Sequence, residues 1–336
     1  MRDSVRLAVT ATVFAFAACS TSSTAKPGTP APQTTPAPTS VTETRGMSDF
    51  DQQVLFKRLD DLDFQIQLGR QMIVRNVLYA GAEGMIIPAY LFLPLDTTAK
   101  HPVVITIHGG VHGDFEHFYI PEVRSLVGHG YVVIAPEYRG STGYGRAHYD
   151  AIDYGGKEVD DVIAARAYLA TYVPSADISR LGIMGWSHGG YITLLSIFRH
   201  PELFRVAVAH VPVTDLVTRM HMHSPEYRQI FAAQQAFGGT VEQNPTPYID
   251  RSPIAHAREL RTPLLVLTAD NDDDVFIQEN HNLRDSMVAA GKMADGLYTY
   301  REWHDPPGKH EFSRVDTPQA HEAWDLTLGF LGKYLQ

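Results

Sequence analysis

The sequence predicts a protein of the α/β class, in which helices cover a mostly parallel, doubly wound sheet. The first observation is a set of short, nearly continuous apolar runs, typical of strands that are buried on both faces of a parallel sheet. These runs are PVVITIHGG, YVVIAPEYRG, RLGIMGWS, FRVAVAHVPV and TPLLVLTAD. The second is that helical stretches such as GKEVDDVIAARAYLATY and FIQENHNLRDSMVAAG separate them. Such alternation favours strand–helix–strand units.

Other elements flank this pattern. A polar, helical lead-in is expected from Asp49 to Gln71, followed by two antiparallel strands, MIVRNVLYAG and MIIPAYLFLP. Because proline lacks a backbone N–H, Pro88 and Pro94 confine the second strand to an edge or an end of the sheet. The stretch from Ser224 to Arg261 fits no strand and predicts helices that cap the sheet edge. The last helix is expected in QAHEAWDLTLGFLGKYL.

The first residues have the pattern of an export signal. Arg2 and Arg6 precede an apolar stretch from Leu7 to Ala18 that is too short to span a bilayer. The following FAACS resembles the lipobox of bacterial lipoproteins, with Phe16 where leucine is usual, and makes Cys19 the expected lipidation site. We therefore expect a lipoprotein signal peptide over 1–18 and a protein anchored in the bacterial cell envelope. A plain signal peptide or an apolar start of a cytosolic protein are the alternatives.

Residues 19–46 are Ser, Thr, Pro and Ala with almost no large apolar side chain, which predicts a disordered tether. The rest, 47–336, is long enough for one large α/β domain. The net charge of −10 argues against a nucleic-acid partner. The single cysteine excludes an intramolecular disulfide.

The segment Gly185-Trp186-Ser187-His188-Gly189 fits the G-x-S-x-G pattern of a nucleophile elbow. It follows a predicted buried strand and precedes an apolar-periodic helix, which is where such an elbow has to lie. A strained turn would project the Ser187 hydroxyl, and the amino end of the next helix favours developing negative charge. An ordinary glycine-rich loop between strand and helix is the alternative.

A nucleophilic serine needs a base, and the base needs a carboxylate to orient it. The run LLVLTADNDDDVF supplies four acids, Asp270, Asp272, Asp273 and Asp274. Their spacing also resembles a calcium loop, but Val275 stands at the required glycine and His281 at the required glutamate, so no metal is expected. The segment YREWHDPPGKHEFSRVD offers His304 and His310 as bases, and chemistry alone does not separate them.

Acyl transfer also needs N–H donors for the oxyanion. One is expected from His188, the residue after the candidate nucleophile. The other is expected from the loop ITIHGGVHG, where Gly110 is favoured over Gly109. The alternative is that these glycines only form a turn.

Together these motifs resemble the catalytic domain of the prolyl oligopeptidase family of serine peptidases, including its dipeptidyl-peptidase and acylaminoacyl-peptidase branches. The resemblance runs from about Pro102 to Leu335 and rests on several segments in order: HGG, YRGSTGYG, GGKEVDDV, GWSHGGY, RSPIAHARELRTPLLVLTADNDDDV and PGKHEFSRVDT. It implies an α/β-hydrolase fold with Ser187 as nucleophile, Asp272 as carboxylate and His310 as base, His304 being the reserve. The family's usual His-Gly is His-Glu here.

The resemblance differs where specificity is set. The family usually carries an amino-terminal β-propeller, and none is expected here. The aromatic proline pocket of the dipeptidyl branch is not reproduced, since VPVTDLVTRMHMH places Val213 and Leu216 there. With Val275, these are the candidate pocket residues.

The sequence thus predicts an exported, lipid-anchored serine hydrolase that cleaves peptides through an acyl-enzyme, without metal or cofactor. A carboxylic-ester hydrolase with the same triad and a non-catalytic envelope lipoprotein are the alternatives. Oligomeric state cannot be read from the sequence.

Overall fold

The computed structural model describes residues 48–336. The predicted signal peptide over 1–18, the lipidation site Cys19 and the tether over 19–46 lie outside the described residues. Within the described part, no helix is both long and apolar enough to cross a membrane.

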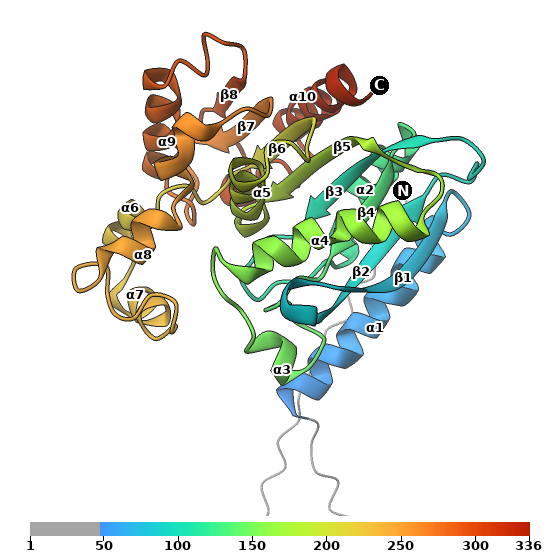
Figure 1. The fold of residues 1–336 in the computed structure, drawn as a ribbon, viewed down its shortest axis with the longest axis horizontal. Helices are drawn as coiled ribbons and strands as arrows, with labels where there is room; N and C mark the ends of the chain where they lie inside the picture. The colour runs from blue at the N-terminus through green and yellow to red at the C-terminus, as the bar shows by residue number, and fades with distance from the viewer. Residues whose placement is uncertain (1–47) are drawn as a thin grey trace, which may run out of the picture. The chain divides into compact units, whose positions relative to one another are not determined.

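The core of the described part is one eight-stranded sheet with the order β1-β2-β4-β3-β5-β6-β7-β8 (Figure 1). Every neighbouring pair from β4 to β8 is parallel, whereas β2 is antiparallel to both β1 and β4. The predicted, mostly parallel sheet is therefore confirmed. The strands are β1 (Ile73–Ala80), β2 (Ile86–Leu93), β3 (His101–Ile107), β4 (Val132–Pro136), β5 (Ala176–Trp186), β6 (Val206–His210), β7 (Leu264–Ala269) and β8 (Tyr298–Trp303).

The expectation that prolines place the second strand at an edge is wrong, because β2 lies between β1 and β4. The carbonyl of Pro88 accepts the N–H of Glu137 at 2.8 Å, just beyond the paired residues of β4. Since the N–H and C=O of a residue in such a pair point the same way, the position of the missing donor of Pro88 faces the Glu137 carbonyl, which lies 3.1 Å from His148 Nε2 instead. Pro94 follows the last residue of β2.

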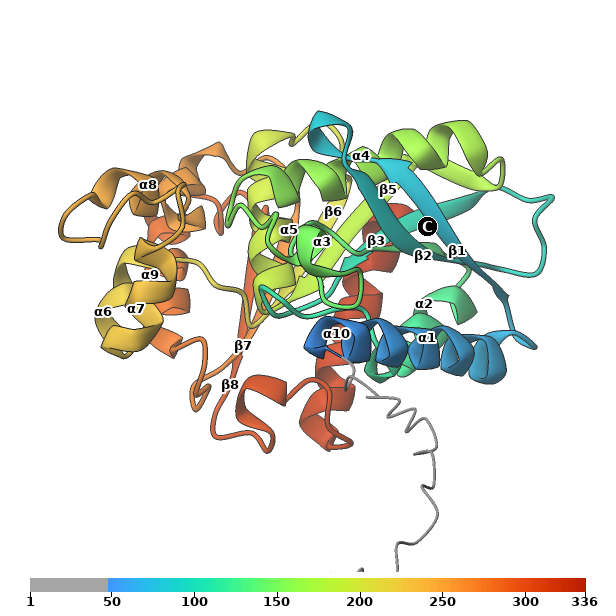
Figure 2. The ribbon, with the colours of Figure 1, turned by 90° about the horizontal axis from the view of Figure 1, so that it is seen from below.

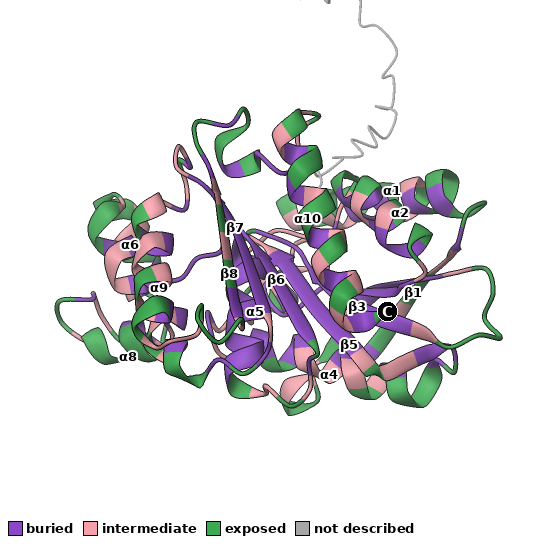
Figure 3. Cartoon of the chain, turned by 90° about the horizontal axis from the view of Figure 1, so that it is seen from above, coloured by how far each residue is buried: buried purple, intermediate pink, exposed green. Residues whose placement is uncertain are grey.

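Helices cover both faces of the sheet (Figure 2). Side chains of α1, α2 and α10 pack in one apolar cluster with one face, and those of α4, α5 and α9 pack in a second cluster with the other. The central strands are almost completely buried between them (Figure 3). The six helices are α1 (Asp49–Leu68), α2 (Ile120–Gly128), α10 (Pro318–Leu335), α4 (Lys157–Tyr172), α5 (His188–Arg199) and α9 (Ile277–Ala289).

The segment from Ser224 to Arg261 is helical and contains no strand, as predicted. It holds α7 (Pro225–Ala232), α8 (Pro245–Asp250) and the 3₁₀ helix η3 (Pro253–Glu259). The preceding α6 (Leu216–Met222) packs on α8 and α9, and η3 packs on α5 and α9, so the segment adjoins the helices of one sheet face. The remaining short helices are η1 (Ala82–Gly84), η2 (His117–Tyr119), α3 (Arg146–Tyr149) and η4 (Lys309–Glu311).

Candidate active site

Ser187 occupies the sharp turn between β5 and α5. Its backbone angles, a φ of 58° and a ψ of −119°, define a conformation that a non-glycine residue rarely adopts. The turn is held because the Ser187 N–H donates to the carbonyl of His210 at 2.9 Å and its own carbonyl accepts the N–H of Tyr191 at 3.0 Å. The serine therefore stands in a strained position that its neighbours enforce.

The two glycines of the motif are required by close backbone contacts. A Cβ on Gly185 would lie 2.2 Å from the carbonyl oxygen of Gly189, and one on Gly189 would lie 2.1 Å from that of Ile107. Neither position has room for any side chain. The G-x-S-x-G spacing is thus what lets α5 start directly against β3 and β5.

The structure brings Ser187, His310 and Asp272 together at the carboxyl ends of parallel strands, as expected for this class of sheet. The Ser187 hydroxyl lies 2.9 Å from His310 Nε2, and His310 Nδ1 lies 2.9 and 2.8 Å from the two oxygens of Asp272. In the tautomer this implies, Nδ1–H donates to the carboxylate and Nε2 accepts the serine proton. All three residues are at most 8% exposed.

Backbone groups hold the carboxylate. Asp272 lies in the loop after β7, where its Oδ1 accepts the N–H groups of Asp274 and Val275, each at 2.9 Å. These bonds fix the direction in which the carboxylate meets His310.

His304 occupies a different place. Its side chain is 92% exposed and pairs with Asp270, not with Ser187 or Asp272. The hydrogen bond that the imidazole donates to Asp270, and secondly the negative charge of that residue, raise the pKa of the imidazole. The structure therefore separates the two histidines that chemistry alone left equivalent.

The loop after β3 carries the candidate oxyanion donors. The Gly109 N–H already donates to the hydroxyl of Tyr119 at 2.9 Å, and a Cβ on Gly109 would lie 2.1 Å from the Trp186 ring. The Gly110 N–H has no partner among the described residues, and the φ of Gly110 is 76°. His188 is the first residue of α5, so its N–H has no partner within the helix.

The four acids after β7 pair with four separate basic side chains instead of converging on one point. The pairs are Asp270 with His304, Asp272 with His310, Asp273 with Lys309, and Asp274 with Arg219. In the part of the chain that the structure describes, no group of three or more acids, histidines or cysteines is placed to hold a metal ion.

Comparison with known proteins places this site in a family. Residues 116–336, a range that includes Ser187, Asp272 and His310, match the model of the prolyl oligopeptidase family. The chain belongs to the prolyl oligopeptidase family. The resemblance inferred from the sequence motifs is confirmed.

The chain is similar to an uncharacterized peptidase, YuxL, of Bacillus subtilis, with 30% identity over 251 residues that cover 74% of this chain and 37% of the relative. Among solved structures it is similar to a puromycin-hydrolyzing peptidase of Mycobacterium tuberculosis, with a TM-score of 0.65, 26% identity and coverage of 79% of this chain and 39% of that one. The chain therefore spans well under half the length of these family members.

The predicted α/β-hydrolase fold is also confirmed. An acylaminoacyl peptidase of Pyrococcus horikoshii superposes with a TM-score of 0.67 at 18% identity, over 81% of this chain and 43% of that one. At this identity the likeness concerns the fold alone.

A buried cation beside the site was not predicted from the sequence motifs. Arg219 on α6 donates to Asp274 Oδ1 at 2.9 Å and to Glu279 at 3.0 Å, and its pKa is raised because these acids outweigh the effect of burial. The other oxygen of Asp274 lies 3.7 Å from His310 Nε2. The only sequence signal was a lone arginine in an apolar stretch.

The His188 ring is a second feature that the sequence did not reveal. It is 2% exposed, and neither ring nitrogen has a hydrogen-bond partner among the described residues. Burial lowers its pKa well below the usual value, so the ring is neutral. Glu158 lies 3.9 Å away and is also buried, which raises the pKa of its carboxyl to about 8.

The candidate pocket residues are all buried. Val213, Leu216 and Val275 are at most 2% exposed and belong to the apolar cluster on the α4, α5 and α9 side of the sheet. Their place in a substrate pocket stays a prediction.

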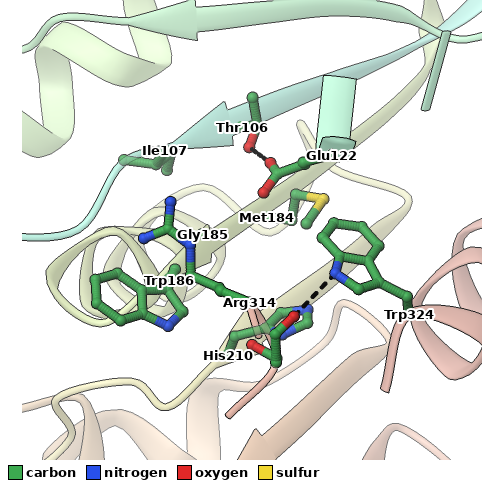
Figure 4. Close-up of a pocket in the computed structure, with 10 residues that line it drawn as sticks. Thr106, Ile107, Glu122, Met184, Gly185, Trp186, His210, Arg314 and Trp324 are labelled. Carbon is green, nitrogen blue, oxygen red and sulfur yellow. Dashed lines mark hydrogen bonds between the residues drawn. The ribbon is translucent and has the colours of Figure 1, made fainter. Parts of the chain in front are cut away.

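Beside the end of β5, lined in part by Gly185 and Trp186, lies a cavity of about 10 Å³, room for about one water molecule (Figure 4). Arg314 lies 4.7 Å from the centre of the Trp186 ring in its wall and 4.3 Å from that of Tyr119. The Trp186 ring in turn packs against His310, with 4.6 Å between the ring centres. Through these aromatic contacts, Arg314 supports both His310 and Tyr119, whose hydroxyl accepts the Gly109 N–H.

A buried lysine joins α1 to the same region. The ammonium group of Lys57 donates to Asp114 at 2.8 Å and to the Phe115 carbonyl at 2.7 Å, and it lies 2.6 Å from Glu137. Burial alone would lower its pKa, but Glu137 and Asp114 outweigh that effect and raise it. Asp114 follows the loop that carries Gly110, so α1 fixes the far end of that loop.

Proposed function

We propose that this chain is a serine peptidase in which Ser187, His310 and Asp272 form the catalytic triad. The observation that carries the proposal is the continuous hydrogen-bond chain from the Ser187 hydroxyl through His310 to Asp272, placed on the strained turn. Family membership and relatives named as peptidases support peptides as the substrate class.

In the proposed reaction, His310 Nε2 takes the proton as Ser187 Oγ bonds to the scissile carbonyl carbon. Asp272 stabilises the imidazolium through Nδ1–H. The oxyanion is bound by the N–H groups of His188 and Gly110, each such donor contributing about 3 kcal/mol. His310 then gives the proton to the leaving amine, and water repeats the sequence to release the acyl group.

Export and a lipid anchor at Cys19 are a separate part of the proposal. They rest on the first residues of the sequence and not on the described fold. Anchoring would place the catalytic domain at a membrane surface, within reach of peptides in the cell envelope.

The test is labelling with a fluorophosphonate probe, followed by assays on peptide amides and on short acyl esters. We expect the wild type to be labelled and Ser187→Ala not to be. Absence of labelling in the wild type would favour the non-catalytic lipoprotein. Ester turnover without any amide turnover would assign the chain to the carboxylic-ester hydrolases instead.

A further inference from the structure

The outer face of α1 carries a row of exposed large apolar side chains. Leu55, Leu59, Leu62 and Ile66 are between 47% and 73% exposed. Figure 2 shows α1 lying along the outside of the described domain, and Figure 3 shows exposed residues along it. The four residues therefore face solvent in the monomer. We call them the α1 seam.

The α1 seam is distinct from the face by which α1 joins its own domain. The buried residues of α1 are Lys57, Asp60, Phe64 and Leu68. At 100° per residue, these four lie on the opposite side of the helix from the seam. Packing within the domain thus explains one apolar face of α1 and leaves the other without a partner among the described residues.

The spacing of the α1 seam is that of a helix-packing heptad. Its members follow one another at intervals of four, three and four residues, which is the alternation of the a and d positions that face a second helix. A helix face that only touches solvent has no need of this repeat. The occupant that the spacing fits is another α-helix.

Charges beside the α1 seam indicate which helix this is. With Leu59 and Ile66 at a and Leu55 and Leu62 at d, Arg58 falls at g and Asp63 at the following e position. In a parallel pair, a g residue faces the e residue five places later on the other helix. Arg58 would therefore face Asp63 of an identical helix, twice by symmetry. Neither residue forms an ion pair in the described part of the chain.

We propose that α1 is the interface between two copies of this chain, which pair in parallel through the α1 seam. The two-fold axis runs along the helices, so the amino-terminal ends of both α1 helices lie at the same end of the pair. A bilayer is the less suitable occupant, because the charged residues of α1 around the seam are mostly Asp, whereas helices that lie on membranes are rich in Lys and Arg. With four apolar residues per copy, the contact fits a weak dimer.

The first test is sedimentation equilibrium of the full chain. We expect a reversible dimer in the wild type, and a dissociation constant raised at least tenfold by Leu59→Asp combined with Leu62→Asp. Gln67→Asp, which adds one negative charge at an exposed position of α1 outside the seam, is the control for added charge on this helix and should leave the constant unchanged. Thermal unfolding should be alike in all three, since the altered side chains are exposed.

The second test addresses the parallel pairing. Arg58→Glu should weaken the dimer because it faces Asp63 of the other copy, and Arg58→Glu combined with Asp63→Arg should restore it. Leu62→Cys, at a d position, should give a disulfide-linked dimer under oxidation. Gln67→Cys should give no more than the wild type, which carries the same Cys19.

A wild type that stays monomeric up to about 100 μM, a concentration at which weak specific dimers form, would overturn the proposal. So would a dimer that the seam substitutions leave intact. A dimer without rescue by the charge reversal and without the Leu62→Cys crosslink would show that the pairing is not parallel. Loss of binding to phospholipid vesicles in the seam variant of a monomeric protein would assign the face to a membrane.

Discussion

The strain at Ser187 shows how single residues set up the chemistry. A positive φ on a non-glycine residue costs about 1–3 kcal/mol, and the contacts of Gly185 and Gly189 leave the turn no other path. The hydroxyl is therefore held toward His310 before any substrate arrives. What the fold supplies to this serine is a fixed position.

At the same scale, the two histidines after β8 should differ sharply in substitution. His310→Ala removes the only base within hydrogen-bond distance of the Ser187 hydroxyl among the described residues, and should lower kcat/KM by at least about a thousandfold. His304→Ala removes an exposed imidazole that pairs only with Asp270 and should leave kcat/KM within about twofold of the wild type. Steady-state kinetics on one peptide amide compares them. A larger loss in the His304 variant would contradict the assignment.

Residue identities near the site were predictable from the sequence only in part. The serine and the acid loop follow directly from motif and strand order. The choice of His310 over His304 needed a family resemblance, because both follow the same strand. The use of the Gly109 N–H by Tyr119 could not be foreseen, because the tyrosine lies ten residues away and meets the loop only through η2.

At the scale of elements, a buried ammonium group adds to the apolar packing of Phe64 and Leu68 in joining α1 to the rest of the domain. Lys57 is 4% exposed and is surrounded by Asp114, Glu137 and the Phe115 carbonyl. Removing one member of a buried ion pair leaves the other charges uncompensated. Through Lys57, α1 therefore compensates the negative charges of Asp114 and Glu137.

Accordingly, Lys57→Met should lower the free energy of unfolding by about 3–5 kcal/mol. Lys157→Met is the matched control, because Lys157 pairs with Glu83 in a contact where both side chains are more than 40% exposed, and should change stability by less than about 1 kcal/mol. Urea denaturation followed by circular dichroism measures both. Equal effects of the two substitutions would show that the Lys57 cluster does not stabilise the fold.

Most elements were predictable because their apolar pattern is local. All five buried apolar runs are parallel strands, and the expected helices between them are present. The position of β2 inside the sheet was not predictable. It depends on how β2 pairs with β4, and the sequence of β2 alone does not determine that pairing. The lead-in helix ends at Leu68 and not Gln71, since Gly69 caps it.

At the scale of the whole molecule, burial has made several histidines poor proton acceptors. Burial lowers the pKa of His108 to about 4 and that of His210 to about 3. In the unfolded chain both would titrate near pH 6.5. Below that pH the unfolded state binds protons that the folded state does not, so each histidine makes the fold less stable as the pH falls.

The consequence can be measured at His210, whose Nε2 lies 3.0 Å from the hydroxyl of Thr327. Lowering the pH from 7 to 5 should cost the wild type up to about 2 kcal/mol of unfolding free energy through this one group. His210→Gln, which keeps a polar side chain, should lose less stability over that range, whereas His321→Gln on the exposed side of α10 should behave as the wild type. Denaturant titrations at pH 7, 6 and 5 give the comparison. Parallel curves for His210→Gln and the wild type would contradict it.

The strand order has a further consequence, for the time course of folding. The Ser187–His310 hydrogen bond joins residues 123 positions apart, and the Asp272–His310 bond spans 38. Contacts of such separation form late, because long loops must close first. Helices and the β1–β2 hairpin can therefore exist while Ser187 still lacks its contact with His310. Activity regained during refolding would report the docking of β7 and β8. A partly folded chain would not cleave the proteins around it.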